Sequence, residues 1–177
     1  MMKYENEVLT CIETRRSVKC FKPDVYPTKD EIDTVIKAGL EAASGRNMQA
    51  PIIVAVTNKE IREKLAEFNG LLYGKADPFY GAPVILIVLA KTVAHTYVYD
   101  GSLTLGNMML AAHSIGLGAC WIHRARETFE REEWKEWLTS IGITDEVEGI
   151  GHLALGYLEG SYPPPKERRD GRVIYVD

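Results

Sequence analysis

Apolar and polar positions along the chain predict helices and strands that follow one another without a strict repeat. Apolar residues recur at helical spacing over residues 29–43, directly after a capping box formed by Thr28 and Glu31. Residues 51–57 are a short β-branched run, which predicts a strand, and Asn58 is a suitable N-cap for a helix after it. The first third of the chain therefore predicts a helix, a strand and another helix.

The remaining pattern predicts a buried strand and then further mixed elements. Residues 82–90 are apolar at every position, as expected for a central strand that is buried on both faces. The later expected elements are a helix rich in small residues (100–116), a strand (119–122), an acidic helix (127–139), a strand (151–158) and a strand-like tail (172–176). The tail has no neighbouring strand in sequence, which indicates pairing elsewhere, including on another chain.

Length and composition restrict the class of protein. The 177 residues fit a single domain over 1–177, and the 46% apolar content is enough for a core without covalent links. Three cysteines without a CxxC motif exclude a disulfide scaffold or a closed zinc site. A net charge of -4 gives no footprint for nucleic acid. Since no signal peptide or membrane span fits, we expect a cytoplasmic protein.

Three apparent motifs do not have the context that their chemistry needs. Residues 70–76 imitate a P-loop, but the segment is one residue short and ends in Ala where Mg²⁺ needs a hydroxyl. Gly149 and Gly151 precede an apolar strand and do not open a helix, so they are no dinucleotide fingerprint. The four histidines lack metal-ligand spacing. We therefore expect no metal site.

A cationic cluster follows the expected first helix. Arg15, Arg16, Ser17 and Lys19 lie within five residues, and such cations repel one another unless an anion lies among them. Guanidinium groups match phosphate oxygens in a bidentate manner, and the serine hydroxyl adds a donor. An exposed basic helix end is the commoner explanation of this pattern alone, so the spacing leaves both interpretations open.

Three other segments carry weaker signals. Residues 42–49 combine small residues with the amides of Asn47 and Gln49, which suits the edge of a heterocycle; a polar helix-end loop with Gly45 at C′ is equally probable. Small residues precede Trp121 in the segment 116–124, and a basic pair, Lys166 and Arg168, lies in the tail, where a solvated turn is the alternative.

Taken together, these segments resemble the nitroreductase family of FMN-dependent oxidoreductases. The matching pieces are RRSxKxF from residue 15, SxxNxQ from residue 44, GLGxCWI from residue 116 and KxR from residue 166. The resemblance implies an α+β fold, a three-layer α/β/α sandwich with a mixed, mainly antiparallel sheet. It also implies an intertwined homodimer with FMN in each interface groove, in which the C-terminal extension 160–177 exchanges a strand with the partner subunit.

The resemblance also implies which residues bind FMN. In the family, the first segment contacts phosphate and ribityl, its lysine lies near flavin N1 and O2, the second loop comes from the partner subunit, and the third packs beside the ring. The implied cofactor contacts are Arg15, Arg16, Ser17, Lys19, Ala43, Ser44, Gly45, Asn47, Gln49, Asn69, Trp121, Ile122, His123, Arg124, Lys166 and Arg168. The second loop departs from the family pattern at Ala43, where many members have proline.

The implied activity needs no side-chain nucleophile or base. A hydride from NAD(P)H would pass through FMN to a small oxidised acceptor, such as a nitroaromatic or a quinone, in a ping-pong reaction, with Lys19 as electrostatic stabiliser. A non-catalytic FMN-binding or flavin-carrier protein is one alternative. A plain α+β interaction protein, whose basic clusters are solvated surface, is another.

Overall fold

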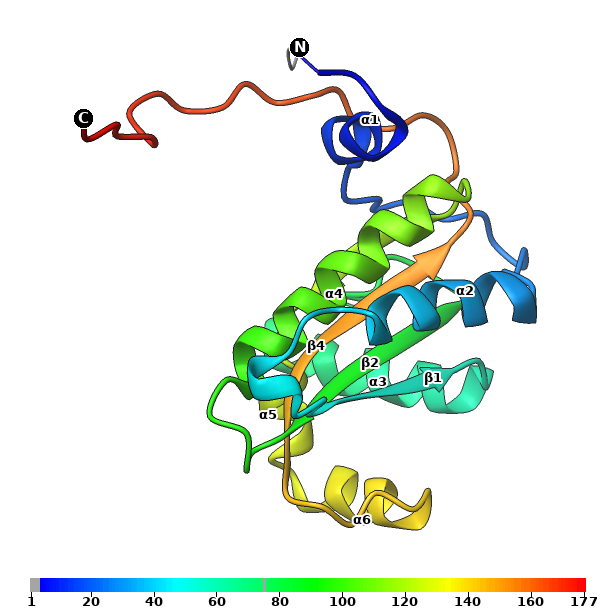
Figure 1. Ribbon diagram of the computed structural model, residues 1–177. Helices are drawn as coiled ribbons and strands as arrows, with labels where there is room; N and C mark the ends of the chain where they lie inside the picture. The colour runs from blue at the N-terminus through cyan, green and yellow to red at the C-terminus, as the bar shows by residue number, and fades with distance from the viewer. Residues whose placement is uncertain (1–3, 75) are drawn as a thin grey trace.

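Helices and strands follow one another in nearly the expected order in a computed structural model, which describes residues 4–74 and 76–177. The elements are α1 (Glu7–Thr14), α2 (Lys29–Leu40), the 3-10 turn η1 (Gly45–Asn47), β1 (Pro51–Val56), α3 (Lys59–Tyr73), β2 (Val84–Lys91), α4 (Tyr97–Ser114), β3 (Gly118–Ile122), α5 (Ala125–Phe129), α6 (Glu132–Ser140) and β4 (Val147–Gly156). Figure 1 shows these elements around one sheet.

The four strands form a sheet in the order β1-β2-β4-β3, and each neighbouring pair is antiparallel. The sheet is therefore mainly antiparallel, as expected. Parallel pairing is confined, in the part of the chain that the structure describes, to one isolated bridge between Ser17 and Ala119. That bridge extends the sheet at its β3 edge with the segment that carries the first cationic cluster.

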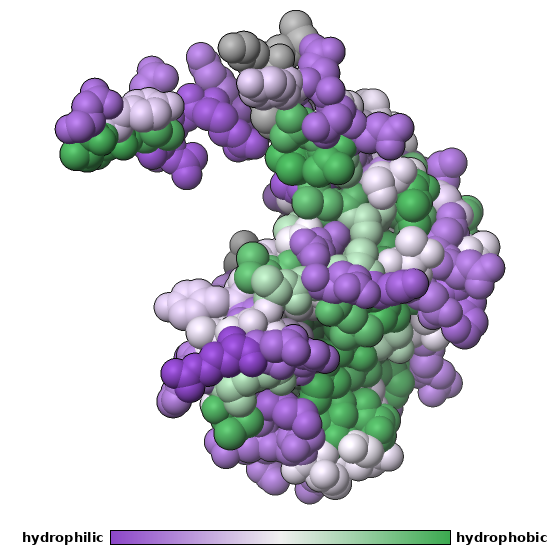
Figure 2. All heavy atoms as spheres, in the orientation of Figure 1, coloured by the Kyte–Doolittle hydropathy of each residue, from purple (hydrophilic) through white to green (hydrophobic). Residues whose placement is uncertain are grey.

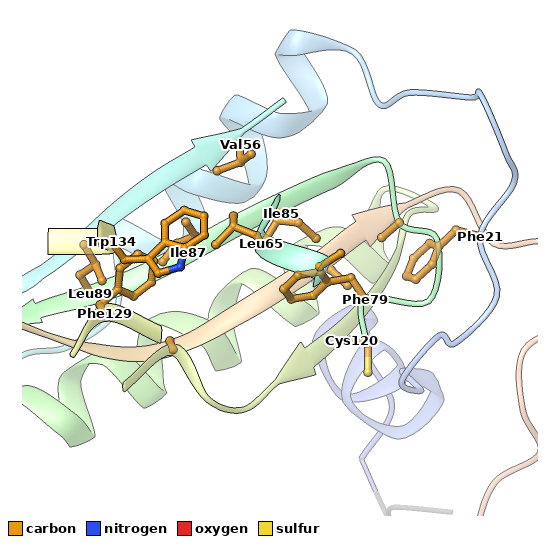
Figure 3. Packing of buried hydrophobic residues seen from close by; sticks show 14 of the residues in the cluster. Phe21, Val56, Leu65, Phe79, Ile85, Ile87, Leu89, Cys120, Phe129 and Trp134 are labelled. Carbon is orange, nitrogen blue, oxygen red and sulfur yellow. The ribbon is translucent and has the colours of Figure 1, made fainter. Parts of the chain in front are cut away.

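Helices cover both faces of the sheet and make three layers, as expected. Side chains of β2 alternate between the faces: Leu86 and Val88 pack in the core beneath α2 and α4, whereas Ile85 and Ile87 pack toward α3, α5 and α6. Figure 3 shows the second of these cores, in which Leu65, Phe129 and Trp134 lie over the strands. All of β2 from Val84 to Ala90 is fully buried, which confirms the predicted central strand.

Local signals account for where several helices begin. Both halves of the predicted capping box are present at Thr28 and Glu31, and the Asn58 side chain accepts a hydrogen bond from the backbone N–H of Ile61. The single acidic helix expected at 127–139 is wrong. Arg131 has an extended backbone (φ -80°, ψ 139°) and separates α5 from α6, so Phe129 and Trp134 both reach the core, with ring centroids 6.2 Å apart.

The tail leaves the body of the protein without forming a strand. Residues 172–176 are extended and exposed, with Val176 at 92% of its full exposure, and their apolar side chains form the green tip of the arm in Figure 2. The expected strand 151–158 occupies Val147–Gly156, and Leu158 instead bridges to Phe21. Strand exchange with a partner subunit stays a prediction.

Packing explains the glycines that imitated a nucleotide-binding motif. A Cβ on Gly149 would lie 2.3 Å from the carbonyl of Ala125, and one on Gly151 would lie 2.3 Å from the Trp121 indole nitrogen. Of the P-loop imitation, Gly70 lies within α3 and Lys75 lies outside the described residues. Across 4–74 and 76–177, none of the helices is both long and apolar enough to cross a bilayer.

His152 lies in the core, where its ring meets Phe79 at 5.3 Å and Phe129 at 6.0 Å between centroids. Neither ring nitrogen has a hydrogen-bond partner within the described chain. Complete burial holds the pKa of His152 at about 3, well below its usual range, and the nearby backbone of His123 and Ile122 offsets only part of this effect. The neutral imidazole is therefore part of the folded state.

We expect His152 to make the protein sensitive to acid. Between pH 6.5 and about pH 3 the unfolded chain binds a proton at this residue and the folded chain does not, so the free energy of unfolding falls by up to about 1.4 kcal/mol per pH unit as the pH is lowered. Urea unfolding of His152→Leu should give a shallower slope, and His95→Leu, at an exposed position, should keep the original slope. Equal slopes in all three proteins would contradict the assignment.

Candidate functional site

The first cationic cluster and the late basic pair, 150 residues apart in sequence, line one cavity. Its volume is about 420 Å³, and its lining residues are Arg15, Arg16, Ser17, Lys19, Pro163, Pro164, Lys166 and Arg168. All six candidate residues of these two segments are in this set, including Lys19, for which a position near the flavin was implied. Five of its members are cations and none is a carboxylate, so the cavity is suited to an anion.

Backbone hydrogen bonds fix the early side of this cavity. The N–H of Val18 donates to the carbonyl of Ala119 at 3.0 Å, beside the Ser17–Ala119 bridge. Val18 is fully buried, and a Cβ on Gly118 would lie 2.9 Å from its side chain, so glycine is required where the segment crosses β3. The cationic side chains are thereby held beside the strand that ends at Ile122.

The late side is attached to the same segment. The N–H of Lys22 donates to the carbonyl of Tyr157 at 2.8 Å, and the N–H of Glu159 donates to the carbonyl of Cys20 at 3.1 Å. Tyr162 then packs edge-on against His113, 5.1 Å between centroids. These contacts carry the chain from β4 to the prolines and the basic pair across the cavity.

Two guanidinium groups in the cavity have nitrogen atoms without partners. Arg16 Nη1 donates to the carbonyls of Glu13 and Arg15 at 2.6 and 2.7 Å. By contrast, Arg15 Nη1 and Arg16 Nε are buried without a hydrogen-bond partner within the described residues. A buried charged donor without an acceptor is costly. A phosphate group would supply oxygen atoms to both, so these residues fit the phosphate of FMN.

The third predicted segment, residues 116–124, includes β3, the strand that bridges to Ser17 of the cavity. Trp121 is 37% exposed and packs against Gly151, and Arg124 takes a left-handed conformation (φ 82°) at the start of α5. Asn69 is buried and donates to Thr128 Oγ1 at 3.2 Å, and the Thr128 hydroxyl lies 2.8 Å from the carbonyl of Arg124. Asn69 therefore reaches this segment through Thr128 and does not line the cavity.

The second predicted segment lies at the other end of α4. The N–H of Gly45 donates to Asp100 Oδ1 near the start of the helix, whereas Thr14 contacts His113 at its end. These helix positions are 13 residues apart, about 20 Å along the axis, and Figure 1 shows η1 and α1 at opposite ends of α4. The structure thus keeps Ala43, Ser44, Gly45, Asn47 and Gln49 away from the cavity of the same chain.

That second loop has an unusual backbone. Arg46, Asn47 and Gln49 all have positive φ, between 47° and 55°, which costs energy for residues other than glycine. Ser44 Oγ accepts from the N–H of Gln49, and a Cβ on Gly45 would lie 2.1 Å from Thr96 Oγ1. A strained loop held this closely is typical of a functional segment.

Several residues of these regions were not predicted from the sequence. Pro163 and Pro164 line the cavity, Asp100 anchors the second loop, and Tyr80 lies under Lys19, whose Nζ is 5.6 Å from the ring centroid. The available signal for Asp100 was that it is the one acidic residue of α4. No sequence signal singles out Tyr80, because its contact joins segments 61 residues apart.

Known proteins that are similar to this chain identify its family. A family model described as the nitroreductase family matches residues 12–157. The chain belongs to the nitroreductase family. This confirms the predicted family resemblance, and the three-layer α+β fold that it implied matches solved members. A nitroreductase with bound FMN from Bacteroides fragilis superposes with a TM-score of 0.87 at 29% identity, over 98% of this chain and 100% of that one.

Curated relatives of this nitroreductase family member are similar over most of their length. An NADPH-flavin oxidoreductase from Vibrio harveyi is 31% identical over 96% of this chain and 72% of that protein. An FMN reductase (NADPH) from Bacillus subtilis is 26% identical over 89% of this chain and 70% of that protein. The similarity therefore extends over most of this chain.

The pKa of His113 depends on its burial and on the charges of two residues that line the cavity, Arg15 and Arg16. Burial lowers its pKa below the usual value, and the positive charges of Arg15 and Arg16 lower it further. Its Nε2 lies 2.8 Å from Thr14 Oγ1, and Nδ1 is buried without a partner within the described residues. An anion in the cavity would screen the two guanidinium charges without changing the burial.

We therefore expect an anion to raise the pKa of His113. Titration of the imidazole signals by NMR, with and without inorganic phosphate, measures this shift, and Arg16→Ala should make it smaller. The exposed His95 supplies an internal reference whose signals should not respond to phosphate at fixed pH. A His113 titration that is the same with saturating phosphate would contradict an anion site beside Arg15 and Arg16.

Proposed function

We propose that this protein is an FMN-dependent NAD(P)H oxidoreductase that reduces a small oxidised acceptor. The observation that carries the proposal is a cavity with no carboxylate in its lining, where two buried guanidinium nitrogens have no hydrogen-bond partner among the described residues. Its lining includes Arg15, Arg16, Ser17, Lys166 and Arg168, for which the family resemblance implies contacts to the phosphate and ribityl of FMN. An ordinary solvated basic surface would leave these nitrogens in water, so the alternative of a plain interaction protein does not account for them.

Each group in the cavity has a distinct part in holding the cofactor. Arg15, Arg16, Lys166 and Arg168 bind the phosphate, and the Ser17 hydroxyl donates to phosphate or ribityl oxygen. Lys19 places a positive charge at the flavin end, where it stabilises negative charge that develops on reduction. When bound, FMN supplies the hydride chemistry. Trp121, Ile122, His123 and Arg124 pack beside the ring and exclude water from it.

A homodimer completes the site. The loop with Ala43, Ser44, Gly45, Asn47 and Gln49 lies about 20 Å along α4 from the cavity of its own chain, so it would reach the FMN of a second copy. Val8, Leu103 and Leu40 are exposed on α1, α4 and α2, and a groove of about 450 Å³ runs between these helices. An apolar surface of this kind is suited to a second chain, and the tail 160–177 would exchange a strand with it.

The acceptor is a flat, electron-poor molecule such as a nitroaromatic or a quinone. A single open groove at a dimer interface has little room for donor and acceptor together. The two would therefore bind in turn on the same face of the flavin, which gives ping-pong kinetics. The proposed reaction needs no side-chain base. The placement of two histidines agrees with this, because His152 is buried in the core and His113 pairs with Thr14.

Arg16→Ala is expected to weaken FMN binding by at least about tenfold, because a charge-assisted hydrogen bond contributes about 1.5–3 kcal/mol. Fluorescence titration of the apoprotein with FMN measures the dissociation constant. Arg131→Ala is the matched control, since Arg131 is exposed at the start of α6 and outside the cavity. Equal dissociation constants for the two variants would reject the proposed phosphate site.

Reduction by nicotinamide separates the enzyme from a flavin carrier. Anaerobic NADH or NADPH should bleach the visible absorption of the yellow protein, and a quinone should restore it. Glu132→Lys, on the exposed surface of α6, should leave both steps nearly unchanged. A yellow protein that neither nicotinamide reduces would favour the non-catalytic alternative, and a chain that takes up no FMN would favour the interaction protein.

A further inference from the structure

The turn at residues 77–82 holds a bulky residue in a costly conformation. Tyr80 has φ 59°, in the left-handed region that an aromatic residue rarely occupies. Such a conformation is unfavourable and persists only where the surroundings impose it. Glycine would adopt this backbone without strain, so the backbone itself gives no reason for tyrosine at this position.

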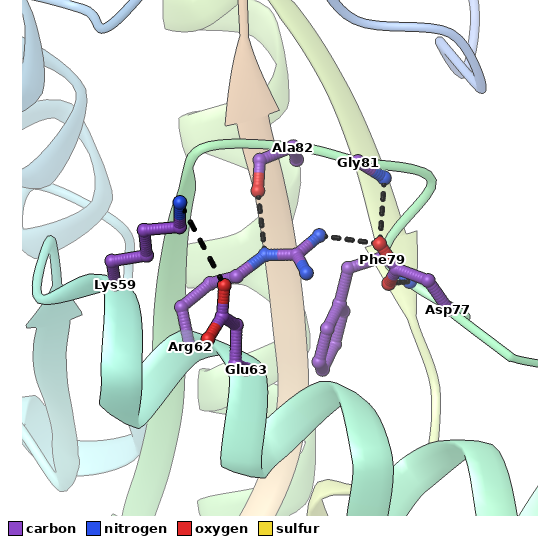
Figure 4. Close-up of polar contacts among 7 residues, drawn as sticks. All are labelled: Lys59, Arg62, Glu63, Asp77, Phe79, Gly81 and Ala82. Atoms are coloured by element: carbon purple, nitrogen blue, oxygen red, sulfur yellow. Dashed lines mark hydrogen bonds and ion pairs between the residues drawn. The ribbon is translucent and has the colours of Figure 1, made fainter. Parts of the chain in front are cut away.

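Asp77 imposes the conformation. Its Oδ1 accepts a hydrogen bond from the N–H of Phe79 at 2.8 Å, and its Oδ2 accepts one from the N–H of Gly81 at 2.9 Å. Arg62, on α3, donates to Asp77 Oδ2 at 2.6 Å and, through Nε, to the carbonyl of Ala82 at 2.9 Å. Figure 4 shows Arg62 joined to both ends of the turn. With only 13% of its side chain exposed, Arg62 attaches the turn to the helix.

The Tyr80 ring lies beneath Lys19, one of the residues that line the cationic cavity. Its centroid lies 5.6 Å from Lys19 Nζ, within the range of a cation–π interaction, and the rest of the residue packs on the core. Lys19 is otherwise exposed and shares the cavity with four like charges. Repulsion from those charges favours a lysine side chain that swings into water, whereas the electron-rich ring attracts it to one place.

Two neighbouring residues of the turn are buried to different extents. Phe79, the preceding residue, is fully buried and fills the core beneath the turn, whereas Tyr80 is only half-buried. Asp77 and Arg62 hold their hydrogen bonds through backbone atoms of the turn and do not need the Tyr80 side chain. The ring also makes a contact outside the turn, where Lys19 Nζ lies over it.

We propose that Tyr80 is a positioning residue for Lys19. The turn that Asp77 and Arg62 fix holds the ring beneath the ammonium group, which keeps that charge at one edge of the cavity. This inference rests on the proposed function, because a fixed Lys19 influences reduction only if a flavin binds beside it. The side chain acts through Lys19 and not by contact with the substrate.

The first arm of the test needs no flavin. In the full chain, an aromatic ring under the ammonium group shifts the ε-CH₂ protons of Lys19 upfield in the NMR spectrum. Tyr80→Leu should abolish that shift, Tyr80→Phe should retain it, and Asp77→Asn should weaken it by loosening the turn. A Lys19 signal that is the same in the parent protein and in Tyr80→Leu would overturn the inference, whatever the protein does with FMN.

The second arm is a double-mutant cycle on the midpoint potential of bound FMN. Tyr80→Leu should lower the potential in the same direction as Lys19→Ala, by an amount equal to an about twofold to fivefold change in the ratio of reduced to oxidised FMN. In the Lys19→Ala background it should have no further effect, and Tyr80→Phe should restore the parent value. A purely structural role would not produce this dependence on Lys19.

A matched lysine controls the cycle. Lys59 lies on α3, where its Nζ is 4.0 Å from Glu63, and Lys59→Ala should combine additively with Tyr80→Leu. Additive effects of Lys19→Ala and Tyr80→Leu would overturn the positioning role and indicate that Tyr80 acts independently of Lys19. A chain that binds no FMN would overturn the proposed function, and the Lys19 signal would still decide whether Tyr80 holds the lysine.

Discussion

Repulsion among five cations in one cavity is the constraint on which the rest of the site depends. Arg15, Arg16, Lys19, Lys166 and Arg168 come together without a neutralising carboxylate in the lining, and such an arrangement would open if the chain were free to move. Buried residues of the same segment oppose this opening. Val18, directly before Lys19, and Phe21, two residues after it, lie in the core, and backbone hydrogen bonds join this segment to β3 and to the residues after β4. The free energy of core packing therefore keeps these like charges close together in spite of their repulsion.

The same strands that oppose this repulsion also determine the surface beside the cavity. Gly151 on β4 leaves room for the Trp121 indole, and His152, the next residue, pairs in register with Ile122 while its ring enters the core. One face of β4 therefore supports the ring-side segment, and the other anchors the hydrophobic layer with Phe79 and Phe129. Because these are consecutive residues of one strand, a slip in register would disturb the core and the site together.

Local signals were sufficient to predict most of the fold, and the two basic segments that the sequence singled out line one cavity. The capping box at Thr28 and the apolar run from residue 82 depend on neighbours in sequence, and both are present. The break at Arg131 and the turn held by Arg62 and Asp77 could not be predicted, since each depends on packing partners that only the folded chain brings together. The roles implied for individual flavin contacts stay predictions.

Left-handed backbone conformations of non-glycine residues are concentrated in or beside the segments proposed to contact the flavin. Among the described residues other than glycine, those with positive φ are Asp24, Arg46, Asn47, Gln49, Tyr80 and Arg124. All but the first belong to the second loop, the turn beneath Lys19 or the segment after β3. Strain of this kind and unpaired buried guanidinium nitrogens both raise the free energy of the ligand-free fold. A ligand that supplies acceptors to those nitrogens lowers it again, so the affinity of the cavity for an anion and the stability of the fold are thermodynamically linked. Substitutions that relieve the repulsion should therefore stabilise the ligand-free chain while they weaken binding.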